Sequence, residues 1–586
     1  MNSRYQTKDG AWHDHQSVLL RQAWKQDGKV RRHTIAPLTH LPADQVDALE
    51  AVFNRGARPQ DPAAVAGVEL GAGLSHGAVA AAWEMSRKLG LPAMVGPESR
   101  ERDIVMGLVA AGVCHPGSKI AQASWWADTT LGEDLGLAGA GKDEVCRAMD
   151  WLLERKDQVE AALAGKFLKD PGANPAGLVF YDLTSTWVEG DRCQLAKRGH
   201  SRDKKKGKRQ IEFALVAAPG GIPVAVRVFP GNTADPAAFK DAITAVKDQF
   251  KMDVAIMVGD RGMVTGTRID DLRERDGLGW VGALDRPQIA ALAGDGGPLQ
   301  LTLFDQSDLF RFTSEKYPGE VLIACRNPFS QAAAKARRQD LIDATTADIA
   351  KIPLKGRDRK PKTASQLERA VGRAVNKRKV GKFLTVEVAD GQIAVARDPD
   401  AIAKAEAIDG VYAIRTSLTE DEMAPADVVR VYKRLSRVEA DFKMLKSVDM
   451  QVRPVRHWVD GRVEAHLLVC LLAAVVAWHL RRAWAPLTFE DEAEPAPTTP
   501  SKPAKRSDHA DQKASRRARE DGIPLRPFAG LLAHLALMTR NPVTVNTHAG
   551  AVAFTEVSRA TPDQAEAFKL IGAKIPPKIA YKNNRG

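Results

Sequence analysis

One apolar run constrains the fold of this chain more than any other feature. Residues 178–183 are continuously apolar except for Asp182. A run of this kind is typical of a strand that is buried on both faces of a sheet. A carboxylate inside such a strand is costly unless it joins a hydrogen-bond network or binds a metal ion. The run therefore predicts an internal strand with one acid, Asp182, that takes part in a hydrogen-bond network or binds a metal ion.

The segments that follow this run predict an α/β core with a mixed sheet. Two more strands joined by a glycine turn indicate a meander, and two further strands alternate with helices. Asp260 follows one of these later strands in a glycine turn, so we expect it at the carboxyl edge of the sheet. Open α/β sheets bind ligands along that edge. The predicted strands cover residues 178–183, 209–217, 223–229, 253–258 and 279–284.

A third acid lies on a predicted amphipathic helix at residues 431–446. Tyr432, Glu439 and Lys446 are spaced seven apart and form a polar stripe that Lys443 joins. This stripe borders the apolar one, so Glu439 is expected at the edge of a buried interface. The alternative is an ordinary Glu–Lys pair on a solvated helix face. The apolar stripe consists of Val431, Leu435, Val438, Phe442 and Leu445.

Asp182, Asp260 and Glu439 together suggest metal-ion chemistry. Clustered carboxylates repel one another unless cations neutralise them. Oxygen ligands suit Mg²⁺ or Mn²⁺, and two such ions roughly 4 Å apart support an in-line phosphoryl displacement. The chain has no glycine-rich nucleotide loop, no serine-hydrolase elbow and no Cys/His set with zinc spacing. Its net charge of +12 and pI of about 9.3 favour a nucleic acid as the partner.

The pattern divides the whole chain into seven regions. Within the second region, residues 115–126 are either a DNA-binding segment or an ordinary capped helix. Within the fourth, the basic run at 331–382 either follows phosphates or is simply solvated. The regions are a β-hairpin in 1–40, a mainly helical, candidate DNA-end-binding region at 41–170, the first part of the core at 177–285, an inserted basic α+β domain at 286–425, the second part of the core at 426–482, a disordered linker at 483–523, and a C-terminal helix with a basic tail at 524–586.

Cysteine usage and hydropathy predict the compartment. The five cysteines lie far apart and form no C-x-x-C pair, which favours a reducing environment. The first residues lack the apolar stretch of a signal peptide. The longest apolar run, residues 467–478, is too short to cross a bilayer and indicates a buried helix. We therefore expect a soluble cytoplasmic protein that does not enter a membrane.

The order of several short motifs resembles the DDE transposases of bacterial insertion sequences. The resemblance covers roughly residues 15–482. It implies a multidomain α/β protein with a ribonuclease-H-like catalytic core and a mixed β-sheet. An inserted α+β domain interrupts that core, and a mainly helical region precedes it. The motifs lie at 116–119, 181–186, 199–203, 229–233, 258–263, 410–416, 432–446 and 457–466.

The resemblance assigns roles residue by residue. Asp182, Asp260 and Glu439 match the catalytic triad, which implies that they bind two Mg²⁺ ions, with Mn²⁺ as a possible substitute. Tyr432, Glu439 and Lys446 match a family signature of tyrosine, arginine, glutamate and lysine. Leu435 stands where that signature has its arginine, so Arg434 or Arg437 would have to take its role. The residues expected to bind DNA are Tyr432, Arg434, Arg437, Lys443 and Lys446.

The implied activity is cleavage at the ends of an insertion sequence followed by strand transfer. Water attacks the phosphodiester at the element end, and the freed 3′-OH then attacks target DNA. The partners would be double-stranded DNA at the inverted repeats and the target, and a second copy of the chain in a homodimer. The protein would act in the cytoplasm at the bacterial nucleoid. Three alternatives stay open: a metal-dependent nuclease without strand transfer, a catalytically silent transposase-derived DNA-binding protein, and a structural protein.

Overall fold

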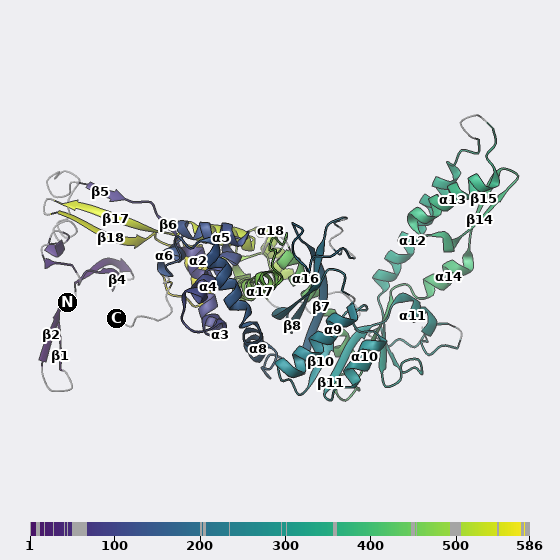
Figure 1. Cartoon of the computed structure of the whole chain (residues 1–586), viewed down its shortest axis with the longest axis horizontal. Coiled ribbons are helices and arrows are strands. Elements are labelled where there is room, and N and C mark those ends of the chain that lie inside the picture. The colour runs from purple at the N-terminus through teal and green to yellow at the C-terminus, as the bar shows by residue number, and fades with distance from the viewer. Residues whose placement is uncertain are drawn as a thin grey trace.

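The computed structural model of the 586-residue chain is elongated, with its N-terminal strands at one end (Figure 1). Small β-elements occupy that end, and a helical region, a large sheet and a helical extension follow along the long axis (Figure 1). The structure describes all residues except 1, 7–11, 17, 27–28, 40, 44, 48, 50–66, 200–201, 203–204, 206, 234, 295, 301, 307, 356–359, 447–451, 453, 493–505, 548–549, 576–578 and 580–586.

The large sheet has eight strands and contains every strand predicted for the core. Its order is β12-β13-β16-β11-β10-β7-β8-β9. The first three core strands form the predicted antiparallel meander, and the next two run parallel to the first. The predicted α/β architecture with a mixed sheet is therefore confirmed. These strands are β7 (Leu178–Trp187), β8 (Gln210–Ala218), β9 (Ile222–Pro230), β10 (Ala255–Val258) and β11 (Leu278–Ala283).

Three more strands extend the same sheet antiparallel beyond β11. They are β16 (Val411–Thr416), β13 (Val321–Arg326) and β12 (Leu309–Phe312). The sequence predicts an inserted domain over the whole of 286–425, whereas strands near both ends of that region pair within the core sheet. The four central residues of β13 are buried, so this strand needs neighbours on both sides. Strand β16 pairs with the edge of β11, and β13 then pairs with β16.

Only the middle of that region projects from the sheet as a separate extension (Figure 1). It has its own small core, which includes Ile342, Phe383 and Ala405. Asp409 anchors the extension, because its buried carboxylate accepts hydrogen bonds from Arg338 in the extension and Arg286 beside the sheet. Its elements are α12 (Pro328–Ala350), α13 (Ala364–Arg378), η3 (Gly381–Phe383), β14 (Leu384–Ala389), β15 (Gln392–Arg397) and α14 (Pro399–Ala407).

Helices within the region predicted to be mainly helical, 41–170, pack around helix α17 (Asp460–Ala483). Helices α2, α4 and α7 all contact α17, which is apolar over most of its circumference. The region contains α2 (Gly77–Leu89), α3 (Leu91–Val95), α4 (Arg100–Cys114), α5 (Lys119–Trp125), η1 (Trp126–Asp128), α6 (Thr130–Asp134), α7 (Lys142–Leu153) and α8 (Lys156–Phe167).

Helix α17 has the length and hydropathy of a membrane-spanning helix, unlike the shorter apolar run noted in the sequence. Within the protein, 83% of its most apolar window is buried, as in the central helix of a packed domain. Among the described residues, the only other candidate is α4 taken together with residues 119–128, a pair bent by 93°.

The helix predicted at 431–446 is broken. It consists of the end of α15 (Pro425–Lys433) and of α16 (Leu435–Lys446), with a turn at Arg434. Helix α15 packs on β11, β12 and β16, whereas α16 packs on β7, β9 and α17. The two helices thus cover different strands of one twisted sheet, which requires the change of direction.

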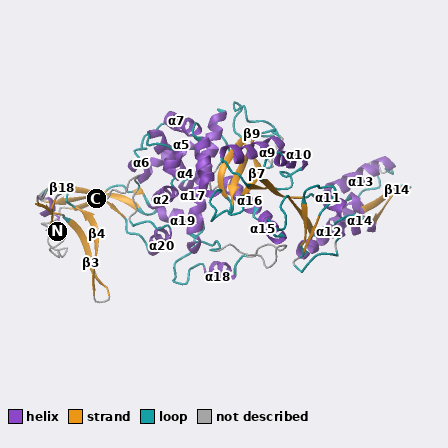
Figure 2. Cartoon of the chain, turned by 90° about the horizontal axis from the view of Figure 1, so that it is seen from below, coloured by secondary structure: helices purple, strands orange, loops and turns teal. Residues whose placement is uncertain are grey.

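The remaining helices connect or cover the sheet. Helix α9 contacts β7 and β9, and α10 contacts β11 and α9, so the meander and the parallel strands are both covered (Figure 2). The helices are α9 (Asp235–Thr244), the π-helix η2 (Ala245–Gln249), α10 (Gly266–Arg273) and α11 (Arg286–Leu292).

The region 483–523, predicted to be a disordered linker, contains η4 (Ala485–Leu487) and α18 (Asp508–Arg516). The prediction is therefore wrong for these residues; residues 493–505 lie outside the described part. Lys513 supplies the physical reason. Its buried Nζ donates to the carbonyl oxygens of Ala485 and Glu490 and forms an ion pair with Glu492 at 3.1 Å. A polar composition thus does not prevent packing here.

The two chain ends add small sheets. The predicted N-terminal hairpin is present as β3 (Leu19–Gln26) and β4 (Lys29–Pro37), beside a second pair, β1 (Asn2–Gln6) and β2 (Trp12–Gln16). The C-terminal region was predicted as one helix and a tail, and it also contains two strands that pair with β5 and β6, far earlier in the chain. These elements are β5 (Gly67–Leu70), β6 (Leu74–Ser75), α19 (Phe528–Ala536), β17 (Thr539–Thr547), β18 (Gly550–Val557) and α20 (Pro562–Leu570).

Candidate active site

Asp182 interrupts the otherwise buried first eight residues of β7, as the sequence predicted. Its Oδ1 accepts a hydrogen bond from the main-chain N–H of Leu183 at 2.8 Å. Burial raises the pKa of Asp182 to about 7, and the nearby charges of Asp260 and Glu439 act in the same direction. The Leu183 hydrogen bond and the Arg202 guanidinium oppose this shift. The acid therefore lies in an electronegative, partly desolvated position.

The parallel register brings Asp260 to Asp182. Val258 in β10 pairs with Phe180 in β7, so each acid lies two residues further along neighbouring parallel strands. The Asp260 carboxylate also closes the turn after β10, since Oδ1 accepts from the main-chain N–H of Met263 at 2.9 Å. Buried Arg268 braces this turn by donating to the carbonyl oxygen of Met263 at 2.7 Å.

Glu439 projects from α16, which packs on β7. Its side chain is exposed, and its charge raises the pKa of both Asp182 and Tyr432. The break before α16 does not separate Glu439 from the strand acids, because α16 packs directly over β7. The structure thus brings all three predicted acids within electrostatic reach of one another.

Tyr432 lies at the same site from the end of α15. Burial raises its pKa to about 12; the charge of Arg261 opposes this shift, and Asp260 and Glu439 add to it. The phenol is therefore protonated at neutral pH and faces two carboxylates. The sequence prediction did not include Arg261, although it directly follows Asp260 in the chain.

Of the other four residues predicted to bind DNA, the structure describes the side chains of two. Arg434 is half-buried at the break between the two helices, and Lys443 is exposed on α16. The side chains of Arg437 and Lys446 lie outside the described part of the structure. Leu435 is only 4% exposed and belongs to the main hydrophobic core. An arginine at position 435 would therefore enter apolar surroundings.

Arg202 is a second cation at the site that the sequence prediction missed. Its Nη1 donates to the carbonyl oxygen of Leu183, and its main-chain N–H donates to Ser185 Oγ at 3.0 Å. Both contacts lie on β7 directly after Asp182. The only sequence signal was its place in the motif at 199–203, quoted above for the family resemblance and not for chemistry.

The site fits a divalent cation by its donor chemistry. Asp182, together with Asp260 and Glu439, whose charges raise its pKa, forms an oxygen-rich set that a hard cation would neutralise. Within the described part of the chain, no three Asp, Glu, His or Cys side chains are grouped closely enough to ligate one ion. Ligation by all three acids would thus require their side chains to move closer together.

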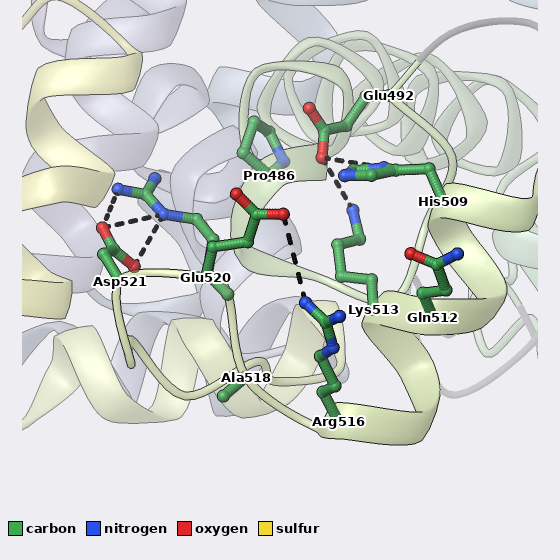
Figure 3. A pocket seen from close by; sticks show the side chains of 10 residues that line it. Pro486, Glu492, His509, Gln512, Lys513, Arg516, Ala518, Glu520 and Asp521 are labelled. Atoms are coloured by element: carbon green, nitrogen blue, oxygen red, sulfur yellow. Dashed lines mark hydrogen bonds and ion pairs between the residues drawn. The ribbon is translucent and has the colours of Figure 1, made fainter.

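A cavity of about 390 Å³ lies elsewhere, between η4, α18 and the loop that follows it (Figure 3). Its lysine and arginine side chains are paired with its own acids: Lys513 with Glu492, Arg516 with Glu520, and Arg519 with Asp521 (Figure 3). This cavity contains no residue of the acidic cluster, and its internal ion pairs leave little net charge for a ligand.

Comparison with known proteins identifies the domain that carries the acids. Residues 176–476 match the family model described as the transposase DDE domain, which is just over half of the chain. The matched segment contains Asp182, Asp260 and Glu439. Comparison with curated proteins finds no significant match. The chain therefore belongs to the family of the transposase DDE domain.

Proposed function

We propose that this protein is a DNA transposase that cleaves the ends of an insertion sequence and transfers the freed strands into target DNA. One observation supports this most. Acids from β7, from the end of β10 and from α16 influence one another electrostatically, and all lie within the matched transposase segment. Phosphoryl transfer requires an oxygen-rich site of this kind beside a cationic surface.

In the proposed mechanism Asp182, Asp260 and Glu439 would hold Mg²⁺ ions, or Mn²⁺ in their place, once their side chains move closer together. The bound ions would supply the positive charge that activates the attacking oxygen and stabilises the leaving one. Tyr432, protonated at neutral pH, would donate a hydrogen bond to a phosphate oxygen. Arg202 and Arg261 would balance the negative charge of the reacting phosphate and position it. Arg434 and Lys443, with Arg437 and Lys446, would hold the DNA backbone.

We further infer a ribonuclease-H-like core. The supporting observation is the strand order β9-β8-β7-β10-β11, in which an antiparallel meander is followed by two strands parallel to β7. The mainly helical region before it would recognise the DNA ends. The active species would be a homodimer that holds two ends together, and it would act in the cytoplasm at the nucleoid.

The experiment compares wild-type protein with Glu439→Gln on a labelled duplex that carries the inverted repeats flanking this reading frame. In Mg²⁺, the wild type should produce 3′-OH ends and joined products, and the variant should bind the duplex but produce neither. Glu274→Gln is the matched control, because Glu274 is an exposed acid on the same domain.

The other outcomes separate the alternatives. Cutting of unrelated duplexes without joining would favour a nuclease. Binding of the ends without cutting in either Mg²⁺ or Mn²⁺ would favour a silent DNA-binding protein. Full activity of Glu439→Gln would remove Glu439 from the proposed site.

A further inference from the structure

A strongly basic surface lies beyond Asp182 along β7. It is formed by the connection between β7 and β8, residues 188–209, and by residues 455–460; we call it the connection surface. Residues 188–209 contain nine lysines and arginines against three acids. This excess of six equals half of the net charge of the chain. The described cations in the connection are all exposed: Arg192, Lys197, Arg198, Arg202, Lys205, Lys208 and Arg209.

Two tryptophans lie among these cations. Trp458 is 56% exposed and is the only tryptophan among the strongly exposed apolar residues of the described part. The guanidinium carbon of Arg192 lies 4.9 Å from the centroid of its ring. Lys205 Nζ lies 5.3 Å from the centroid of Trp187, the last residue of β7. An indole that remains largely in water has no role in the core and is available to a ligand.

Hydrogen bonds join the start of the connection to residues 455–460. Val188 bridges Val455, and the main-chain N–H of Glu189 donates to the carbonyl oxygen of Val455 at 2.8 Å. Asp460 Oδ1, at the start of α17, accepts from the main-chain N–H of Gln194 at 2.9 Å. Residues 188–194 are thus fixed against the segment that carries Trp458.

Gly190 lies beside the indole of Trp458. A Cβ at this position would be 3.5 Å from Trp458 Nε1, which is an ordinary contact distance. The φ of Gly190, +100°, favours glycine there, so the turn beside the indole depends on main-chain conformation and not on a lack of space.

We propose that the connection surface binds single-stranded DNA, with a base stacked on Trp458 and the phosphates on the surrounding cations. An exposed aromatic ring within a basic groove is the combination that binds unpaired strands, because every base offers a face for stacking. In a duplex the bases are already stacked inside the helix, so an exposed indole gains nothing from them. The inference rests on the proposed function in taking DNA as the partner, and it adds an unpaired strand bound at the connection that follows β7.

The test measures DNA binding by the full chain in EDTA, where cleavage does not occur. A fluorescent 20-nucleotide single strand and a blunt duplex of the same sequence are titrated at several salt concentrations. Trp458→Ala should weaken single-strand binding roughly 5- to 100-fold and change duplex binding less than about twofold. Trp458→Phe should retain most of the affinity. Lys205→Gln should reduce the salt dependence by about one counterion for the single strand.

Phe329→Ala is the matched control, because Phe329 is 68% exposed on α12 in the extension and should not affect either ligand. A 2-aminopurine base in the single strand adds a direct readout, since stacking on Trp458 should quench it in the wild type and not in Trp458→Ala. Thermal melting of each variant establishes that it is folded.

Two results would overturn the proposal. One is equal single-strand affinity of Trp458→Ala and wild type. The other is an equal loss of single-strand and duplex affinity, which would indicate a general electrostatic surface without stacking. Because these measurements need no metal and no cleavage, their failure would leave the proposed transposase activity standing. Conversely, inactive wild-type protein would not affect the binding result.

Discussion

Arg202 Nη1 donates a hydrogen bond to the carbonyl oxygen of Leu183, the residue that follows Asp182 in β7. The guanidinium is thereby held beside the carboxylate of Asp182. Its charge lowers the pKa of Asp182, whereas burial raises that pKa by more. A cation from the connection between β7 and β8 thus partly offsets the repulsion among the three acids.

We predict that Arg202→Gln lowers the rate of end cleavage roughly 10- to 100-fold while DNA binding changes less than about threefold. A charge-assisted contact at this position contributes about 1.5–3 kcal/mol, and each 1.4 kcal/mol changes a rate tenfold. Arg202→Lys should recover part of the loss. Lys240→Gln is the control, because Lys240 is an exposed lysine of α9, outside the connection, and pairs with Asp271 at 4.0 Å. Equal rates for Arg202→Gln and wild type would contradict the prediction.

Leu435 occupies a core position where the family signature has an arginine. Leu435→Arg is expected to destabilise the fold by more than Leu435→Ala, which should cost about 2–5 kcal/mol. Leu435→Met should cost less than about 1.5 kcal/mol, since it conserves volume. Urea denaturation measures the three variants. A Leu435→Arg protein that is as stable as wild type and cleaves faster would show that the position accepts the signature residue.

The ion pair between Glu320 and Arg415 joins the residue before β13 to strand β16. Arg415 Nε donates to Glu320 Oε2 at 2.7 Å, and both side chains are buried. Glu320→Gln should lower the free energy of unfolding by about 3–5 kcal/mol, because it leaves a buried guanidinium without its counter-charge.

The exposed pair of Arg430 and Asp427 is the control for this prediction, with side chains 51% and 54% exposed. Asp427→Asn should cost less than about 1 kcal/mol. Comparable losses for the two variants in chemical denaturation would show that burial does not govern the contribution of the Glu320 pair.

His466 is expected to make stability depend on pH. Burial lowers its pKa to about 3, and the nearby charge of Lys119 adds to the effect. Nε2 lies 3.2 Å from the carbonyl oxygen of Val452, so it carries the proton, and buried Nδ1 has no hydrogen-bond partner among the described residues. Protonation at Nδ1 would therefore bury an unsatisfied charge.

An unfolded histidine titrates near pH 6.5, so below that pH the unfolded state binds a proton that the folded state excludes. The stability present above pH 6.5 should thus decline as the pH falls towards 3. His466→Gln should reduce this decline by about 1–3 kcal/mol between pH 7 and pH 4. Gln512→Asn, which changes an exposed residue that does not titrate, should leave the decline unchanged. Parallel curves for His466→Gln and wild type would refute the prediction.

Local sequence signals predicted the central strands and the first two acids of the site. The run that contains Asp182 and the turn that contains Asp260 can each be recognised from a few consecutive residues, because burial and turn formation depend on neighbouring side chains. The helical periodicity around Glu439 was also correct for α16, although not for the residues before Arg434.

Other features depended on partners far along the chain. Strand β17 pairs with β5, which lies more than 460 residues earlier in the chain. The local sequence of neither strand predicts which strand it pairs with. The strands β12 and β13 join the core sheet because the edge beyond β11 accepts them, and Lys513 orders α18 by bonding carbonyl oxygens outside that helix.

The amino-acid sequence alone determined which segments become buried strands and helices, where the acids stand on them, and that the chain carries a strongly basic connection. Only the tertiary structure decided that β10 lies parallel to β7 in the register that brings Asp260 to Asp182, and that Arg202 reaches the same strand. The physical reason is that hydrophobicity and turn formation act over a few residues, whereas register and side-chain reach are set by which surfaces pack together.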